Sequence, residues 1–350
     1  MRKNTNIGVP NIIFWSDVNL MIKGMKMKRF LLNTVITTVV LGLSFNALAS
    51  TTLKLSHNQN RSHPVHEALQ YMAKRTETLT DGALKIRVYP DAQLGSQRES
   101  LELVQKGALA LAKSNAAELE AFSKPYGVYN LPYLFNSKEH YYKVMESPIG
   151  QNILQSSKEN GFIGLAYLDA GARSFYTSKP IKTPEDLKGL KVRVQPSPTA
   201  VNMVQFLGGN PTPLAYGELY TALQQGVVDA AENNIPSYTL SRHSEVSKYF
   251  SLDEHTMVPD VLVISTKIWD ALSENEQRAL KQAADEATAK MQELWVASEN
   301  KERESAIKQG STFVEVDKST FKAAVIPMYE ELQKTDPDTY KIVEEIRKLQ

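Results

Sequence analysis

The chain has 350 residues, of which 42% are hydrophobic and 23% are charged, a composition sufficient for one large or two ordinary packed domains. The formal net charge is +1, but residues 1–49 hold six basic residues and one acidic residue. The remainder therefore has 34 basic and 38 acidic residues. This balance excludes a typical basic nucleic-acid-binding surface. The absence of cysteine excludes disulfides, thiol nucleophiles, thiolate metal sites and a lipid anchor attached to cysteine.

The N-terminal region has the order of segments found in an export signal. A basic cluster at residues 26–29 precedes an apolar run at residues 30–43, and Ala-Leu-Ala follows at residues 47–49. We expect signal peptidase to cleave near Ala49 and the mature protein to reach the periplasm of a Gram-negative cell. An uncleaved anchor is the alternative, although the run is shorter than the ~20 residues of a membrane-spanning helix. Because residues 1–24 precede a signal of normal shape, we expect translation to start at position 25 or 27.

The mature chain begins with alternating strands and helices. Hydrophobic alternation predicts strands at Thr52–Ser56 and Leu84–Val88. Helices are predicted at Pro64–Thr80, with proline in the first turn, and at Ser96–Lys106, with Gly107 at the end. This rhythm is typical of an α/β domain built on a central sheet.

The same rhythm returns later in the chain. Strands are predicted at Phe162–Ala166, Ser174–Thr177 and Leu190–Val194, and helices at Thr183–Leu187, Ala200–Leu207 and Gly217–Gln225. Thr183 and Pro184 suit the N-cap and the first position of the first of these helices. We therefore predict two α/β segments in series.

One long helix is predicted near the C-terminus. Ser273–Glu276 is a capping-box sequence, and neither glycine nor proline follows it before Gly310. A helix of roughly 36 residues would be about 54 Å long, which exceeds the width of a small domain. We expect it to cross both α/β segments. The alternative is a pair of helices broken near Ser298–Asn300.

Six stretches of the mature chain strongly resemble the solute-binding subunits of TRAP (tripartite ATP-independent periplasmic) transporters, the DctP-type receptors. They are LKLSHN at 53–58, GALKIRVYPDAQLGSQRESLELVQKGAL at 82–109, LPYLF at 131–135, LKGLKVRVQPSP at 187–198, GGNPTPLAYGELYTALQQGVVDAAENN at 208–234 and EVSKYF at 245–250. The resemblance covers about residues 51–345, and its most specific part is residues 187–234.

The resemblance implies a type II periplasmic-binding-protein fold. Two α/β lobes would hold the ligand in a cleft between them and close on binding, and the long helix would cross both. We expect lobe I to comprise residues 50–170 and 259–298, and lobe II to comprise residues 171–258 and 299–350. The implied partners are a small and a large membrane subunit driven by a sodium gradient, and we expect the receptor itself to be a monomer.

Two arginines are the first candidates for ligand contact. Arg193 lies in a predicted strand between valines, where an unpaired charge would be costly to bury, and its guanidinium can hold a carboxylate through two parallel hydrogen bonds. The resemblance matches it to the family's carboxylate-binding arginine; the alternative is a charge at a strand edge. Arg173 resembles a second ligand arginine of several members, with an interlobe salt bridge as its alternative.

Three further candidates lie between residues 216 and 234. Asn233 matches a ligand residue of the family, and Asn234 follows it; the alternative for both is a turn-forming role. Tyr216 matches an aromatic residue that packs on the ligand, although plain core packing would also explain it.

The last three candidates come from the first α/β segment. Asn58 follows the first strand, at the carboxyl edge where open α/β sheets bind ligands, and it matches a family contact; a loop role is the alternative. Lys113 occupies a position where relatives contact ligand hydroxyls, but a solvated surface lysine would look the same. Glu99 could accept hydrogen bonds from sugar hydroxyls, or be a first-turn acid favoured by the helix dipole.

The supply of hydrogen-bonding groups favours a polyhydroxy acid over a small alkyl acid. Resemblance to the subgroup with ENN-x-PSY (232–238) and RV-x-x-SP (193–198) implies a hexuronate such as D-glucuronate or D-galacturonate. Keto-gulonate, gluconate-like acids, sialate and C4-dicarboxylates are the alternative ligands. A sensory module with the same fold, or the receptor of an ATP-dependent transporter, is the alternative function.

The sequence predicts no enzyme, cofactor or metal. It has no H-E-x-x-H, G-x-S-x-G, P-loop or G-x-G-x-x-G motif. His57, His63 and His66 form a cluster, but a zinc site would need a further ligand in tetrahedral reach.

Overall fold

A computed structural model describes residues 50–349 of the protein. The predicted signal peptide, its cleavage site and the alternative start positions lie outside the described residues. Within residues 50–349, no helix combines the length and the apolar character that a bilayer crossing requires.

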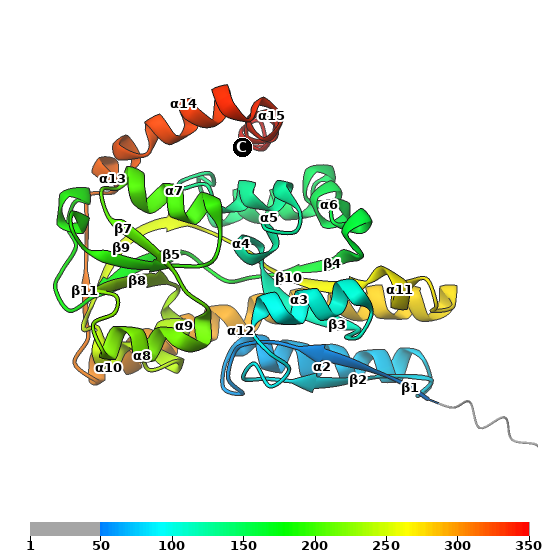
Figure 1. Ribbon diagram of the computed structural model, residues 1–350. Coiled ribbons are helices and arrows are strands. Elements are labelled where there is room, and N and C mark those ends of the chain that lie inside the picture. The colour runs from blue at the N-terminus through cyan, green and yellow to red at the C-terminus, as the bar shows by residue number, and fades with distance from the viewer. Residues whose placement is uncertain (1–49, 350) are drawn as a thin grey trace, which may run out of the picture. The chain divides into compact units, whose positions relative to one another are not determined.

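The first sheet has five strands in the order β2-β1-β3-β10-β4 (Figure 1). Strands β1, β2 and β3 are parallel, whereas β10 runs antiparallel to both β3 and β4. The strands are β1 (Thr51–Ser56), β2 (Leu84–Tyr89), β3 (Leu111–Asn115), β4 (Phe162–Leu168) and β10 (Asp260–Ser265). The predicted strands and helices of this segment are confirmed within one or two residues, with α2 at Pro64–Leu79 and α3 at Gln97–Lys106.

The second sheet has six strands in the order β11-β9-β5-β8-β6-β7. They are β5 (Arg173–Thr177), β6 (Lys191–Val194), β7 (Asn210–Pro213), β8 (Ala230–Asn233), β9 (Tyr249–Thr256) and β11 (Thr312–Val314). Strand β6 lies between β7 and β8 and is parallel to both, so it is an internal strand. The two sheets with their covering helices confirm the predicted two-part α/β fold.

Short helices connect and cover the strands. The α-helices are α4 (Ala116–Leu119), α5 (Lys138–Glu146), α6 (Pro148–Gln155), α7 (Pro198–Phe206), α8 (Leu219–Gln224), α9 (Ile235–Leu240), α10 (His243–Val246), α11 (Thr266–Trp269), α13 (Lys318–Ala324), α14 (Ile326–Thr335) and α15 (Pro337–Arg347). The 3-10 helices are η1 (Lys124–Asn130), η2 (Lys158–Asn160), η3 (Pro184–Leu187) and η4 (Tyr216–Glu218). The helix predicted at Thr183–Leu187 is therefore a 3-10 turn, and the one predicted at Gly217–Gln225 is divided between η4 and α8.

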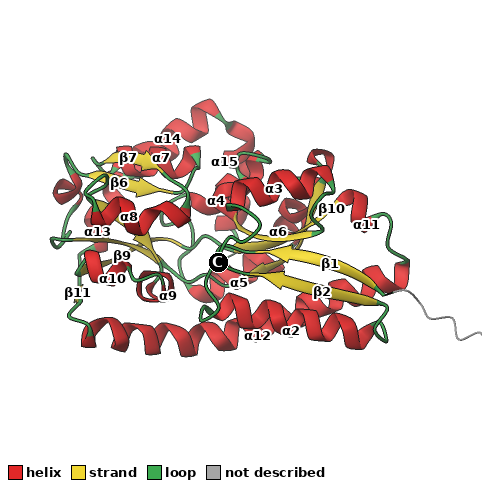
Figure 2. Ribbon diagram, turned by 60° about the horizontal axis from the view of Figure 1, so that its bottom comes forward, coloured by secondary structure: helices red, strands yellow, loops and turns green. Residues whose placement is uncertain are grey.

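The chain passes between the two sheets three times. Residues 169–172 lead from β4 to β5, residues 257–259 lead from β9 to β10, and α12 (Glu274–Lys308) leads towards β11. Helix α12 is unbroken, so the alternative of two helices near Ser298–Asn300 is wrong. It packs on α2 at one end and on α9 at the other, which confirms that it crosses both α/β segments (Figure 2).

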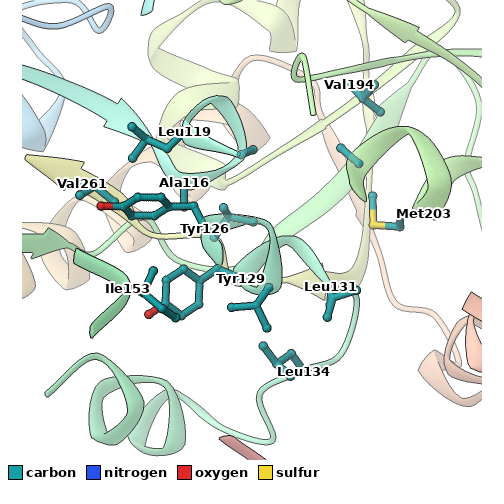
Figure 3. Close-up of a cluster of buried hydrophobic side chains, with 14 of the residues drawn as sticks. Ala116, Leu119, Tyr126, Tyr129, Leu131, Leu134, Ile153, Val194, Met203 and Val261 are labelled. Carbon is teal, nitrogen blue, oxygen red and sulfur yellow. The ribbon is translucent and has the colours of Figure 1, made fainter. Parts of the chain in front are cut away.

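The largest hydrophobic cluster draws residues from both halves. Tyr126 and Tyr129 of η1 are fully buried, and the cluster continues to Val194 of β6 and Met203 of α7 (Figure 3). The C-terminal helices extend it, because α14 packs on α7 and α15 packs on α6 and η1. The C-terminal segment thus contacts elements that the predicted boundaries assign to different lobes, and those boundaries stay a prediction.

The start of α12 depends on a capping box. The Ser273 side chain accepts from the backbone N–H of Glu276, and the Glu276 carboxylate accepts from the backbone N–H of Ser273. We expect Ser273→Ala to lower the free energy of unfolding by about 1 kcal/mol, because it leaves a helix-terminal N–H without this partner. Urea unfolding measures the change. The control is Ser298→Ala in the middle of the same helix, which should leave stability within about 0.5 kcal/mol of wild type; an equal loss in both variants would contradict the role of the cap.

Candidate ligand-binding site

A narrow cavity lies between the two sheets. It has a volume of about 20 Å³, close to what one water molecule needs. Seven of the eight predicted site residues line it: Asn58, Lys113, Arg173, Arg193, Tyr216, Asn233 and Asn234. The structure therefore brings together residues from both α/β segments that are up to 176 positions apart in the sequence, from Asn58 to Asn234.

Arg193 is the most deeply buried cation of the cavity. It is 0% exposed on the internal strand β6, which rules out the alternative of a strand-edge charge. Its Nε and Nη2 donate to the carbonyl of Leu214 at 3.0 and 2.7 Å. Its Nη1 is buried without a hydrogen-bond partner among the described residues. Burial lowers the pKa of Arg193, which reflects the cost of holding this charge away from water.

Arg173 is fixed by an acid of its own sheet. Its Nε and Nη2 donate to the two carboxylate oxygens of Glu232 at 2.5 and 2.8 Å, and its Nη1 donates to Asn233 Oδ1 at 2.8 Å. Residues 173 and 232 lie on the adjacent strands β5 and β8, so this is a salt bridge within one sheet and not the interlobe bridge considered as an alternative. The guanidinium therefore orients Asn233 at the cavity.

A buried acid–base chain continues behind Arg173. His255 Nδ1 lies 2.6 Å from Asp253 Oδ2, and its Nε2 lies 3.5 Å from Glu232. Burial opposes the charge on Glu232, but Arg173 and His255 outweigh it and lower the pKa of Glu232 to about 2. Burial likewise opposes the charge on His255, but Asp253 and Glu232 raise its pKa to about 9. The two cationic side chains, Arg173 and His255, thus balance the two carboxylates, Glu232 and Asp253.

The asparagine pair and the tyrosine have local partners as well as positions at the cavity. Asn234 Oδ1 accepts from the backbone N–H of Ser237 and caps α9, which is the turn-forming role considered for it. Tyr216 lies with its ring centroid 5.9 Å from the Arg193 guanidinium carbon, and its hydroxyl is 2.6 Å from that of Ser241. The ring thereby covers the guanidinium.

The first α/β segment contributes two of its three candidates. Lys113 is 2% exposed and pairs with Asp260 at 2.9 Å, so it is not a solvated surface lysine. Asn58 lines the cavity, and its Oδ1 is buried with no partner in residues 50–349. The prediction for Glu99 is wrong. Its carboxylate is exposed and accepts from the backbone N–H of Ser96, because it completes the capping box that starts α3.

Several lining residues were missed in the sequence. They are Gln59, His63, Gln97, Asn115, Ala170, Gln195, Ser237 and Asp260. Asn115 ends strand β3, so the rule that located Asn58 at the carboxyl edge of a sheet would also have located it. Asp260 has no such signal, because only the antiparallel pairing of β10 with β3 brings it beside Lys113.

The histidine cluster does not gather as a metal site. Within residues 50–349, no three histidine or acidic side chains converge as ligands for an ion. His57 Nε2 lies 3.0 Å from His66 Nδ1, and burial lowers the pKa of His57 to about 2. His63 instead accepts a hydrogen bond from the backbone N–H of Val65 through Nδ1. Its ring proton is therefore on Nε2, which lies 3.3 Å from Ser237 Oγ.

The chain matches known solute-binding proteins over most of the described residues. Residues 55–336 match the family model of bacterial extracellular solute-binding proteins, family 7 (DctP). The chain belongs to this family. An uncharacterized protein YiiZ of Salmonella typhimurium is 40% identical over 87% of this chain and 94% of its own length.

Two solved structures of this family are similar in sequence and fold. A TRAP periplasmic solute-binding protein of Xanthobacter autotrophicus, solved with bound β-D-galacturonate, is 39% identical, with a TM-score of 0.82 over 85% of this chain and all of its own. One from Anaerococcus prevotii, solved with α/β-D-glucuronate, is 39% identical, with a TM-score of 0.83 over 86% of this chain and 98% of its own. This chain is accordingly a solute-binding receptor of the TRAP type, a class whose members are periplasmic and capture small acids for transport.

The buried His255 predicts a specific pH dependence of stability. Between the ordinary histidine pKa of 6.5 and about 9, the folded protein holds a proton on His255 that the unfolded chain has released. This contribution to the free energy of unfolding is complete below pH 6.5 and is lost as the pH rises through about 9. We expect His255→Gln to abolish that part of the slope in urea unfolding between pH 6.5 and 9.5. The control variant His140→Gln, outside the chain of charges, should keep the slope; a wild-type slope in His255→Gln would contradict the assignment.

Proposed function

We propose that this protein captures a hexuronate, D-glucuronate or D-galacturonate, in the cavity between its two sheets and delivers it to the membrane subunits of a TRAP transporter. The observation that carries the proposal is the buried Nη1 of Arg193, a charged donor that has no partner among the described residues. A ligand carboxylate would accept from it and supply the missing counter-charge.

The charges of the cavity favour a monocarboxylate over a dicarboxylate. Lys113 is paired with Asp260, and Arg173 is paired with Glu232. Arg193 is the one cation of the described lining that lacks a carboxylate partner. A second carboxylate on the ligand would have to be desolvated without a cation of its own, which is costly in a buried site.

The neutral groups of the cavity favour a ligand with hydroxyls. Asn58 Oδ1 and Gln59 Oε1 are buried acceptors without a donor among residues 50–349. A hydroxyl donates a hydrogen bond to such an oxygen, whereas a methylene or a carboxylate cannot. A polyhydroxy acid could therefore satisfy both these acceptors and the Arg193 donor. The two relatives solved with hexuronates, at 39% identity, support the same class of ligand.

The size of the cavity implies that the protein opens to admit its ligand. A volume of about 20 Å³ is far below the few hundred Å³ of common ligand sites, so the described state is a closed one. Residues 50–170 with 259–298 and residues 171–258 with 299–350 would be the lobes that part. We propose that the receptor is a monomer that is exported and cleaved near Ala49. It would bind and release its ligand chemically unchanged, without a cofactor or a metal.

The proposal is tested first by a ligand screen. The mature protein, residues 50–350, is heated with D-glucuronate, D-galacturonate, D-gluconate, sialate, 2,3-diketo-L-gulonate, succinate and neutral D-glucose. We expect the two hexuronates to raise the melting temperature most, because a ligand that binds only the folded state stabilises it. Succinate and glucose should have little effect. A larger shift with succinate than with either hexuronate would overturn the proposed ligand class.

Substitution of Arg193 tests the carboxylate contact. We expect Arg193→Ala to weaken the affinity for the hexuronate between about tenfold and about 150-fold, the loss of one charge-assisted hydrogen bond. Arg193→Lys keeps the charge but not the planar fork, and it should also bind more weakly than wild type. Titration calorimetry measures both.

The matched control is Arg278→Ala, which removes an exposed arginine on α12. It should bind with wild-type affinity. Wild-type affinity in Arg193→Ala, with circular dichroism showing a folded protein, would contradict the proposed contact.

A further inference from the structure

The side of the cavity that the first sheet forms carries its own ion pair. Lys113 lies on β3 and Asp260 on the neighbouring strand β10, and both are buried. Lys113 Nζ lies 2.9 Å from Asp260 Oδ2, and Asp260 Oδ1 accepts from Asn115 Nδ2 at 3.1 Å. Glu118 also interacts electrostatically with Lys113, but it accepts from Gln97 Nε2 and forms no ion pair with the lysine. Asp260 is therefore the counter-charge of Lys113.

The register of two strands fixes this pair. Strand β10 runs antiparallel to β3, with Asp260 opposite Asn115 and Leu262 opposite Lys113. Opposite residues share a face of a sheet, and so do residues two apart on one strand, so Lys113, Asn115 and Asp260 lie on the same face. Both members of the pair belong to one sheet. They consequently stay together when the two sheets part to admit a ligand.

The pair decides what the far end of a ligand meets. Arg193 lies on the second sheet, so a ligand held there by a carboxylate turns its remainder towards the first sheet, where Lys113 and Asp260 line the cavity. A second carboxylate at that end would meet a lysine that is already neutralised and the oxygens of an acid, and it would lose its water without gaining a free cation. A hydroxyl there can donate to Asp260 or accept from Lys113. This side of the cavity therefore suits a hydroxyl and disfavours a carboxylate.

We propose that Asp260 determines the selection of hexuronates over hexarates, the diacids that carry a second carboxylate at the other end of the six-carbon chain. It does so by neutralising Lys113, which leaves Arg193 as the cation for the ligand. This role of Asp260 rests on the proposed function, because it concerns the same cavity and takes the hexuronate as the ligand. It assigns the choice between a monoacid and a diacid to one residue.

Asp260→Asn tests this role. The change keeps the size of the side chain and an oxygen for Asn115, but it removes the charge, so Lys113 becomes a buried cation without its counter-charge. A second ligand carboxylate can then accept a charge-assisted hydrogen bond from Lys113. We expect the affinity for D-glucarate relative to D-glucuronate to rise about tenfold or more over the wild-type ratio. Titration calorimetry with both ligands, and with galactarate against D-galacturonate, measures the change.

The matched control removes both charges at once. In the double variant Lys113→Met with Asp260→Asn, the acid is gone but no cation is freed, so the diacid should gain nothing over the hexuronate. An equal gain in the single and the double variant would overturn the proposal, because it would show that Asp260 does not act through Lys113. Circular dichroism checks folding. If Asp260→Asn does not fold, Asp260→Ser replaces it, since it also removes the acid and leaves room for water beside Lys113.

The result can be told apart from a failure of the proposed ligand. If neither hexuronate binds wild type, that ligand is wrong, and the role of Asp260 is judged from melting temperatures: D-glucarate should stabilise Asp260→Asn more than wild type or the double variant. If a hexuronate binds wild type but the diacid gains nothing in any folded variant of Asp260 alone, the role of Asp260 is overturned while the ligand stands.

Discussion

The constraint on which the site depends is the burial of the Arg193 guanidinium. A charge this far from water is tolerated only if its donors are bonded and a counter-charge lies near. The carbonyl of Leu214 accepts from two of its nitrogens, and the ring of Tyr216 covers it. The protein supplies these neutral partners, but no carboxylate of residues 50–349 forms an ion pair with the guanidinium; Glu232 instead pairs with Arg173. Arg193, on strand β6 of the second sheet, is therefore a site for an anionic group of the ligand.

The two neighbouring cations, Arg173 and Lys113, are paired with acids, which leaves Arg193 as the cation that a ligand carboxylate would bind. Arg173 and Lys113 would compete for the same carboxylate if they were free, but each has its own buried acid, Glu232 and Asp260. The pairing of Arg173 extends through His255 to Asp253, so that its charge is balanced deep in the sheet. The cavity consequently presents one unsatisfied charge among many neutral polar groups, which is the complement of a hydroxylated monocarboxylate.

Three segments join the two sheets close to this site. The chain crosses from one half to the other at residues 169–172, at residues 257–259 and along α12. Side chains from all three connections line a second cavity of about 330 Å³. Several residues of the ligand-binding cavity therefore lie on or beside these connections, among them Ala170, Arg173 and Asp260.

The sequence determined the local elements, because their signals are local: hydrophobic alternation, proline at helix starts, and capping residues at both ends of α12. It also indicated Arg193 and Asn58, mainly through the resemblance to a known family. An arginine between valines and an asparagine after a strand added a local chemical reason for each. Glu99 was misplaced because the same first-turn position suits both a ligand contact and a capping box, and only the coordinates distinguish the two. Tertiary structure alone decided the pairing of Lys113 with Asp260 and the anchoring of Arg173 by Glu232. They join residues from distant parts of the chain, and no periodicity or spacing records which strands will become neighbours.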